Sequence, residues 1–181
     1  EVFQLERLPK RVVIVGGGYI ANEFAGVFHQ FGAHVTIVNR SDVILRGYDE
    51  QIVDRLVKIS LAKGIDFRFN STFDAIERQE DGSLLCRMNG CDDIPADEVV
   101  FAIGRQPNTE GLGLEELGVK LGTRGEVIVD DQYRTNIPSV FAVGDVTDRV
   151  QLTPVAIREG HAFADTQFGG KPCTVDYDNI P

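Results

Sequence analysis

The stretch RVVIVGGGYIA, residues 11–21, decides the fold of this chain. Its first five residues form an apolar, β-branched run, which is typical of a strand buried in a parallel sheet. Gly16, Gly18 and Ala21 then follow the pattern G-x-G-x-x-A, in which the first glycine permits a tight turn and the second lets the backbone approach a pyrophosphate. Strand and turn predict an α/β, Rossmann-like dinucleotide-binding domain.

A helix is predicted directly after this turn, over residues 19–31, with Gly32 as its C-terminal signal. Its N-terminus is where a pyrophosphate would bind. The alternative is a glycine-rich turn in an α/β domain that binds no nucleotide. The side chains expected to share the inward face of the helix are Ile20, Phe24, Val27, Phe28 and Phe31.

The residues after the second predicted strand, 34–38, indicate which dinucleotide would bind. In an NAD site this strand ends in Asp or Glu, which binds the ribose 2′-hydroxyl. Here Asn39 is neutral, Arg40 follows it, and Arg46 comes six residues later. A carboxylate would repel a 2′-phosphate, whereas guanidinium groups bind one. The loop therefore predicts NADP(H) rather than NAD.

The remaining segments predict a mixed fold with helices, a parallel sheet and an antiparallel crossover meander. Asp49 is the expected N-cap of a helix that runs to about Ala62. The inward residues expected on that helix are Ile52, Leu56, Ile59 and Leu61. The remaining elements are strands at 65–69, 73–78, 83–88, 91–94, 98–103, 127–129 and 139–143, of which the three from 73 to 94 form the meander, and a helix at 152–168.

The composition of the chain limits which partners and cellular locations are expected. The 181 residues carry a formal net charge of −10, which argues against nucleic acid and anionic membranes as partners. No apolar run is long enough to predict a membrane span, and no secretory signal is recognisable. Three cysteines in such a chain favour a reducing, cytoplasmic location. The histidines at 29, 34 and 161 have no further ligands at metal spacing, so we expect no metal site.

Cys86 and Cys91 are separated by four residues, a spacing that invites a redox interpretation. Asn89-Gly90 between them is a hairpin-turn signal, which places the two cysteines near opposing strands of a small sheet. A reactive thiol is better placed at a helix N-terminus, where its pKa is lowered. We therefore expect two structural cysteines. Cys173 lies in a polar tail and is expected to be exposed.

Four separated segments resemble the NADPH-dependent flavoprotein disulfide reductases, and most closely the glutathione reductases. They are GGGYIANEFAG (16–26), NRSDVILRGYD (39–49), FAIGRQPNT (101–109) and TNIPSVFAVGDVTDRVQLTPVAIREG (135–160). The resemblance implies an NADP(H)-binding domain at 1–107, the second segment of an FAD-binding domain at 108–178, and the start of a linker to a dimer-interface domain at 179–181. It also implies a fragment of a homodimeric enzyme whose other segments supply the redox cysteines.

The activity implied is hydride transfer from NADPH to FAD and then reduction of a disulfide, with glutathione disulfide as the expected substrate. Trypanothione, thioredoxin and mercuric reductases share most of these motifs and stay open as alternatives. Dihydrolipoamide dehydrogenase fits less well, because it uses NAD. A nucleotide-binding module without catalysis is the alternative from another class.

The resemblance also implies roles for single residues on the NADP(H) side. Gly16, Gly18 and Ile20 match the pyrophosphate turn, and Arg40 and Arg46, next to Asn39, match the 2′-phosphate clamp. Tyr19 matches a tyrosine that covers the flavin until nicotinamide displaces it; the alternative is a partly buried aromatic at a helix start. Glu23 matches a glutamate near the nicotinamide, and as a helix residue it could equally be solvated. The strand end Ile103, Gly104 and Arg105 matches the nicotinamide side.

On the FAD side, the resemblance singles out two places. Asp145 matches the aspartate that binds the FAD ribityl chain, although Gly-Asp is also an ordinary turn after a strand. Leu152 and Thr153 match the start of a helix aimed at the flavin, where the helix dipole would stabilise negative charge on the reduced ring.

Overall fold

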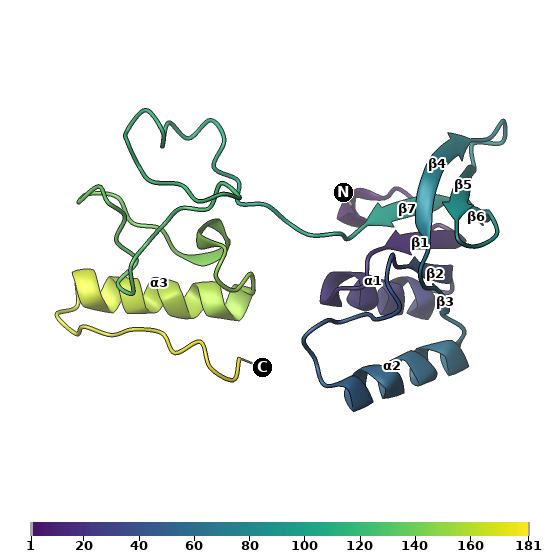
Figure 1. The fold of residues 1–181 in the computed structure, drawn as a ribbon, viewed down its shortest axis with the longest axis horizontal. Coiled ribbons are helices and arrows are strands. Elements are labelled where there is room, and N and C mark those ends of the chain that lie inside the picture. Colours follow the sequence, from purple (N-terminus) through teal and green to yellow (C-terminus); the bar gives the residue numbers. More distant parts are fainter. Residues whose placement is uncertain (1, 181) are drawn as a thin grey trace. The chain divides into compact units, whose positions relative to one another are not determined.

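The structure is a computed structural model that describes residues 2–180. It divides into two compact units, Glu1–Gly104 (unit 1) and Arg105–Pro181 (unit 2), each described by itself below (Figure 1). The predicted division into an NADP(H) domain and a returning FAD segment at 107/108 stays a prediction. So does the expected linker, whose last residue, Pro181, lies outside the described residues.

Unit 1 is built on a four-stranded sheet with the order β3-β2-β1-β7, in which every neighbouring pair is parallel. The chain adds β2 and β3 on one side of β1 and then crosses to place β7 on the other side. This reversal makes a topological switch point at β1, where ligands bind at the carboxyl ends of the strands. The strands are β1 (Arg11–Val15), β2 (His34–Val38), β3 (Asp66–Arg68) and β7 (Glu98–Phe101).

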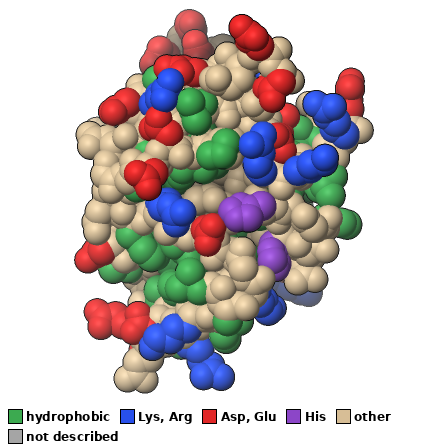
Figure 2. Space-filling view, turned by 90° about the vertical axis from the view of Figure 1, so that its right-hand side faces the viewer, with side chains coloured by type: hydrophobic (Ala, Val, Ile, Leu, Met, Phe, Trp, Pro, Cys, Tyr) green, Lys and Arg blue, Asp and Glu red, His purple; other side chains and the backbone are tan. Residues whose placement is uncertain are grey.

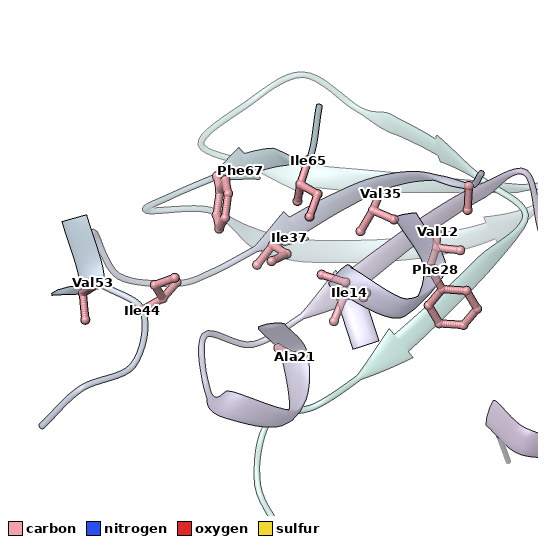
Figure 3. Close-up of a cluster of buried hydrophobic side chains, with 12 residues drawn as sticks. Val12, Ile14, Ala21, Phe28, Val35, Ile37, Ile44, Val53, Ile65 and Phe67 are labelled. Carbon is pink, nitrogen blue, oxygen red and sulfur yellow. The ribbon is translucent and has the colours of Figure 1, made fainter. Parts of the chain in front are cut away.

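Two helices, α1 (Tyr19–Gln30) and α2 (Glu50–Lys63), cover one face of this sheet (Figure 1). Along β1 the side chains alternate, so that Val12 and Ile14 join the core under the helices and Val13 points to the opposite face. Figure 3 shows this helix-side core. Its labelled members are Val12, Ile14, Ala21, Phe28, Val35, Ile37, Ile44, Val53, Ile65 and Phe67.

An antiparallel sheet of order β4-β5-β6 lies against the opposite face of the parallel sheet. Its strands are β4 (Thr72–Arg78), β5 (Leu84–Asn89) and β6 (Ile94–Ala96), so the predicted meander is present. A second core joins the two sheets through Val13, Val38, Cys86, Met88 and Ala96, all buried. The third strand begins at Ile94 rather than Cys91, because Cys91 lies in the turn that follows Gly90, whose φ is +97°.

Each helix buries only part of the face that was predicted: Phe28 on α1 is buried and Leu56 on α2 is half-buried, as expected, but other members of both faces are exposed. On α1, Val27 and Phe31 are 48% and 69% exposed, whereas Ala21 and Ala25 are buried with Phe28. Small side chains face the sheet because the helix follows a tight turn and starts close to β1. The interpretation of 19–31 as one apolar face was therefore wrong in part.

On α2 the predicted inward residues Ile52, Ile59 and Leu61 are exposed, and Val53 is buried instead. The helix packs on the edge strand β3, so only a narrow stripe of it meets the core. Its N-cap is Asp49 as expected: the carboxylate accepts hydrogen bonds from the backbone N–H groups of Gln51 and Ile52.

Unit 2 has little regular structure. It contains the 3₁₀ helix η2 (Gly144–Thr147) and the helix α3 (Thr153–Gln167); a short 3₁₀ helix, η1 (Val2–Gln4), belongs to unit 1. The strands predicted at 127–129 and 139–143 are wrong, since each is reduced to one antiparallel bridge, Leu121–Val127 and Arg134–Phe141. A strand needs a partner of similar length, and the described part of this unit offers single contacts instead.

A buried polar network holds unit 2 together. Glu159, which is 1% exposed, accepts hydrogen bonds from the backbone N–H of Gly144 and from the Tyr177 hydroxyl at 2.6 Å. The Arg149 guanidinium donates to the same hydroxyl at 3.2 Å and lies over the ring of Tyr133. Burial, followed by the contact with Tyr177, raises the pKa of Tyr133. The network ties α3, η2, the loop before Tyr133 and the C-terminal tail together.

Candidate functional site

A pocket of about 550 Å³ lies at the carboxyl ends of β1, β2 and β7, at the switch point of the parallel sheet. This volume is in the range of small-molecule and cofactor sites. All of its lining residues belong to unit 1. They are Val15, Gly16, Gly17, Gly18, Val38, Asn39, Arg40, Ser41, Val43, Leu45, Arg46, Ser71, Thr72, Phe73, Phe101, Ala102 and Ile103.

The glycine turn forms the floor of this pocket. Gly16 has φ +125°, and a Cβ there would collide with the carbonyl oxygen of Ala102 at the end of β7. A side chain is therefore excluded both by conformation and by space. Gly18 has no atom within 4 Å of where a Cβ would lie, so the backbone at this residue faces open space. The turn thus has the tight bend and the open approach that the motif predicts.

The N-terminus of α1 opens from the same turn. Gly18 is its N-cap, with extended backbone, and no side chain caps the helix. The first N–H groups of a helix lack intrahelical partners, and the helix dipole adds partial positive charge there. This arrangement suits an anion such as a pyrophosphate.

The loop after β2 carries two cationic side chains along the pocket. Arg40 and Arg46 are both exposed, and within residues 2–180 neither guanidinium has an ion pair or hydrogen bond. Ile44, between them, is buried in the helix-side core, and the Leu45 N–H donates to the Gly17 carbonyl at 2.7 Å. The loop is therefore anchored while its arginines are free to meet an anion.

Other residues expected at the NADP(H) site lie near the pocket without lining it. Tyr19 and Ile20 are half-buried at the start of α1, and Glu23 is exposed one turn further on. Gly104, with φ +133°, follows the pocket residue Ile103, which is 73% exposed. The strand expected to be buried over 98–103 ends early, at Phe101, and it is half-buried with an exposed end, because the residues at its end form part of the open pocket wall.

Arg105 lies in the second unit and makes its contacts there. Its guanidinium pairs with Asp145 at 2.6 Å and donates to the Gln151 carbonyl at 3.1 Å. Asp145 is exposed in η2, and Leu152 is the N-cap of α3, which starts at Thr153 without a side-chain cap. The structure thus brings Arg105, Asp145 and the start of α3 together in unit 2.

The cysteines are all free thiols. Cys86 is fully buried in β5, and burial, followed by the charge of Asp93, raises the pKa of its thiol. A raised thiol pKa disfavours the nucleophilic thiolate. Cys173 is exposed, as expected. In the part of the chain that the structure describes, no three His, Cys, Asp or Glu side chains gather to form a metal site.

The surface shows no concentration of one charge on the face seen in Figure 2, where acidic and basic side chains are interspersed.

None of the helices among residues 2–180 has the length and apolar character needed to cross a bilayer.

Sequence reasoning missed the part of the pocket wall that comes from the end of β3 and the start of β4. Ser71, Thr72 and Phe73 line it, and Ala102 closes against Gly16. The signal was present in the order of the strands, because the carboxyl ends of neighbouring parallel strands meet at one edge of a sheet.

Switch-point pocket, glycine turn and uncapped helix together define a nucleotide-binding α/β protein. Residues 1–160 match the model of a family described as pyridine nucleotide-disulphide oxidoreductase. The chain therefore belongs to this family, and its mixed α/β fold is that of the flavoprotein disulfide reductases.

Particular relatives fall in the same group. The chain is 47% identical to a glutathione reductase of Burkholderia cepacia over 100% of its own length and 40% of the relative's. It is 43% identical to a trypanothione reductase of Trypanosoma congolense, over 99% of its own length and 37% of the relative's. The chain thus spans about two-fifths of the length of the curated relatives it matches.

Solved structures agree with these relatives. The HOCl-induced flavoprotein disulfide reductase RclA from Escherichia coli superimposes with a TM-score of 0.88 and 30% identity, covering 96% of this chain and 39% of that one. LpdA from Mycobacterium tuberculosis gives a TM-score of 0.88 at 26% identity, over 99% of this chain and 39% of that one.

Proposed function

We propose that this chain supplies the NADP(H) site and the returning FAD segment of a flavoprotein disulfide reductase, and that the whole enzyme reduces glutathione disulfide. The observation that carries the proposal is the pocket in unit 1, which joins a glycine turn to two unpaired arginines. The turn would bind the pyrophosphate, and Arg40 and Arg46 would bind the 2′-phosphate. Asn39 adds no negative charge to oppose it.

The nicotinamide would lie at the other end of this site. Ile103 and Gly104 follow the strand whose end forms the pocket wall, and Ile20 and Tyr19 start the adjacent helix. We assign Tyr19 to cover the flavin until nicotinamide displaces it, and Glu23 to the surroundings of the nicotinamide. These residues bind and orient, whereas the hydride moves between the two cofactors.

The flavin part of the proposal concerns unit 2. FAD would accept the hydride of NADPH and pass its electrons to a disulfide. Asp145 offers an exposed carboxylate to the hydroxyls of the ribityl chain, which would share it with Arg105. The start of α3 at Leu152 and Thr153 has no side-chain cap, so its dipole is open to the flavin.

The substrate and the oligomeric state of the whole enzyme are proposed from the relatives of this chain. Glutathione disulfide is the substrate we propose first, because glutathione reductases from three organisms are 40–47% identical to this chain. Trypanothione disulfide is the second candidate, supported by 43% identity to trypanothione reductases. We further propose a cytoplasmic homodimer without nucleic acid or membrane partners.

Calorimetric titration of the chain with NADPH and with NADH tests the cofactor assignment. A hydrogen bond to a charged group is worth about 1.5–3 kcal/mol. Two arginine contacts then give about 10²- to 10⁴-fold preference for NADPH, with solvent screening favouring the lower end. Equal affinities for the two dinucleotides would contradict the assignment.

Absorbance and turnover of the purified chain test the flavin assignment separately. We expect a colourless protein without disulfide reductase activity, because the family resemblance places the other half of the FAD site and the redox cysteines on further segments. Yellow protein that reduces glutathione disulfide with NADPH would overturn this part and leave the NADP(H) site standing.

A further inference from the structure

We propose that Asn39 is a specificity-determining positioning residue whose amide nitrogen holds the arginine loop, residues 39–46, in its binding shape. The preference for NADP(H) then depends on hydrogen-bond donors at position 39 as well as on the missing negative charge. This inference rests on the proposed NADP(H) site and deepens it.

The backbone of Asn39 is fixed to the sheet. Its N–H donates to the Arg68 carbonyl at 2.9 Å, and its carbonyl accepts from the Ser71 N–H at 3.2 Å. Both contacts continue the pairing of β2 with β3 beyond the last strand residues. Asn39 is also only 8% exposed, so its side chain starts from a rigid, buried position.

The side-chain amide gathers the first half of the loop. Nδ2 of Asn39 lies 3.1 Å from the Ser41 carbonyl, 3.0 Å from the Ser41 hydroxyl and 2.8 Å from the Val43 carbonyl. The Ser41 hydroxyl in turn donates to the Val43 carbonyl at 3.0 Å. All of these acceptors belong to the loop, and Arg40 lies between the donor residue and the first of them.

The second half of the loop is held by other contacts. Ile44 is buried in the core, and the Leu45 N–H donates to the Gly17 carbonyl. Leu45 has φ +50°, a left-handed conformation that a branched side chain rarely adopts. These contacts fix the backbone next to Arg46. The two arginines therefore lie at opposite ends of one loop whose backbone is held in place.

The same side chain also touches the pyrophosphate turn. A Cβ at Gly17 would lie 3.0 Å from the carboxamide atoms of Asn39. Asn39 is thus packed between the glycine turn and the arginine loop. It sets the position of one relative to the other.

A carboxylate at position 39 would fail here for two separate reasons. It would repel a 2′-phosphate directly, and it would place an oxygen without a hydrogen against the carbonyls of Ser41 and Val43. These acceptors are only partly buried, but losing their donor still costs free energy, so the loop would rearrange. An apolar residue would lack the charge but also lack the donors, which separates the two effects.

Binding of 2′,5′-ADP and 5′-ADP to the full 181-residue chain, measured by calorimetry, tests this separation. We expect Asn39→Leu to weaken 2′,5′-ADP about tenfold, which corresponds to about 1.4 kcal/mol, and to leave 5′-ADP almost unchanged. Asn136→Leu is the matched control: Asn136 also joins two backbone segments, donating to the Gly118 carbonyl and accepting from the Lys120 N–H, but in unit 2. It should leave the affinity for both ligands unchanged.

A second variant covers the case in which Asn39→Leu does not fold. Asn39→Asp has nearly the same shape, and its effect on 2′,5′-ADP is measured with Arg40 and Arg46 present and in Arg40→Ala/Arg46→Ala. Charge repulsion alone predicts the same loss in both backgrounds. Loss of positioning predicts a clearly smaller loss once no arginines remain to be positioned.

These measurements separate a failure of the Asn39 inference from a failure of the proposed NADP(H) site. Unchanged 2′,5′-ADP affinity in a folded Asn39→Leu variant would overturn the inference, as would equal weakening of both ligands or equal losses of Asn39→Asp in both backgrounds. If the unmodified chain binds the two ligands equally, the proposed NADP(H) site itself fails.

Discussion

Unit 1 and unit 2 are stabilised in different ways. Unit 1 has three layers with two apolar cores, and seventeen of its described hydrophobic residues are buried, against five in unit 2. Unit 2 relies on one helix and a network around a buried glutamate. Burial of apolar surface is the main favourable term in folding, and paired buried polar groups contribute far less. The proposed nucleotide pocket thus belongs to the part of the chain with the larger core.

The difference extends to the charged groups. The arginines of the unit 1 pocket have no acidic partner among the described residues, whereas Arg105 and Arg124 in unit 2 are paired with Asp145 and Asp148. A site that keeps its cations free is ready for an anion. In unit 2 a ligand would have to compete for groups that already satisfy one another.

Separate production of residues 1–104 and 105–181 should show the largest contrast. We expect the first piece to unfold cooperatively and to bind 2′,5′-ADP, and the second to lack a cooperative transition, because it has few buried apolar side chains. Circular dichroism melting and amide NMR spectra measure this. A cooperative melt of the second piece alone would show that its polar network suffices.

Glu159→Leu should destabilise unit 2 by about 3 kcal/mol, because the change leaves a buried N–H and a partly buried hydroxyl without their acceptor. Hydrogen exchange measured for each unit should show lost protection in unit 2 alone. Exposed Glu115→Leu in the same unit is the control, with a change below about 0.5 kcal/mol. Equal loss of protection in unit 1 would contradict the assignment of the Glu159 network to the stability of unit 2.

Replacing Arg40 and Arg46 with Ala should remove most of the NADPH preference, at least about 10²-fold, while NADH affinity and melting temperature stay constant. The reason is that both guanidinium groups lack partners in the described chain, so their removal breaks no internal contact. Competitive titration measures the ratio. A lower melting temperature would mean that the folded structure of the loop itself depends on these charges.

Changing Cys86 and Cys91 to Ser should leave NADPH binding unaltered and cost about 1 kcal/mol of stability, since a hydroxyl replaces the buried thiol of Cys86. Turnover of the whole proposed enzyme carrying both changes is the decisive measurement. A loss of two or more orders of magnitude with the fold intact would show that the pair is catalytic.

Asp97→Asn should have the smallest effect, about 1 kcal/mol or less, because its ion pair with Arg11 is partly exposed. The hydrogen bond from Arg11 holds the pKa of the Asp97 carboxyl below its usual range. The folded state then binds fewer protons, so this contribution is present above about pH 4 and is lost as the pH falls through the lowered pKa. Denaturant melts of both proteins from neutral to acidic pH should converge at the acid end. A gap that persists there would mean that the loss is not electrostatic.

The sequence predicted unit 1 better than unit 2 for a physical reason. β1 and β2 were predicted residue for residue, because a β-branched run carries its own local signal. The buried faces of α1 and α2 were predicted only in part, since which residues a helix buries depends on the neighbour it meets. Ser139–Val143 has the composition of a strand but pairs only through the single bridge Arg134–Phe141, and strand partners are not encoded locally.

The candidate site follows the same rule. The glycine turn and the arginine loop both line the pocket, and both could be picked out beforehand because their residue pattern is local in the sequence. The contacts of Arg105 with Asp145 and of Asn39 with its own loop were not foreseen. Those contacts depend on the path of the backbone through the loops, which cannot be predicted from a single sequence.

The close approach of Gly16 to Ala102 has a consequence for the order in which the protein can form. The two residues are far apart in the chain, and the whole meander is synthesised between them. A nascent chain that ends before β7 therefore has the glycine motif but lacks one wall of the pocket. Nucleotide binding should begin only once β7 has left the ribosome and docked beside β1. Binding of the ligand by a nascent chain would therefore report that the parallel sheet is complete.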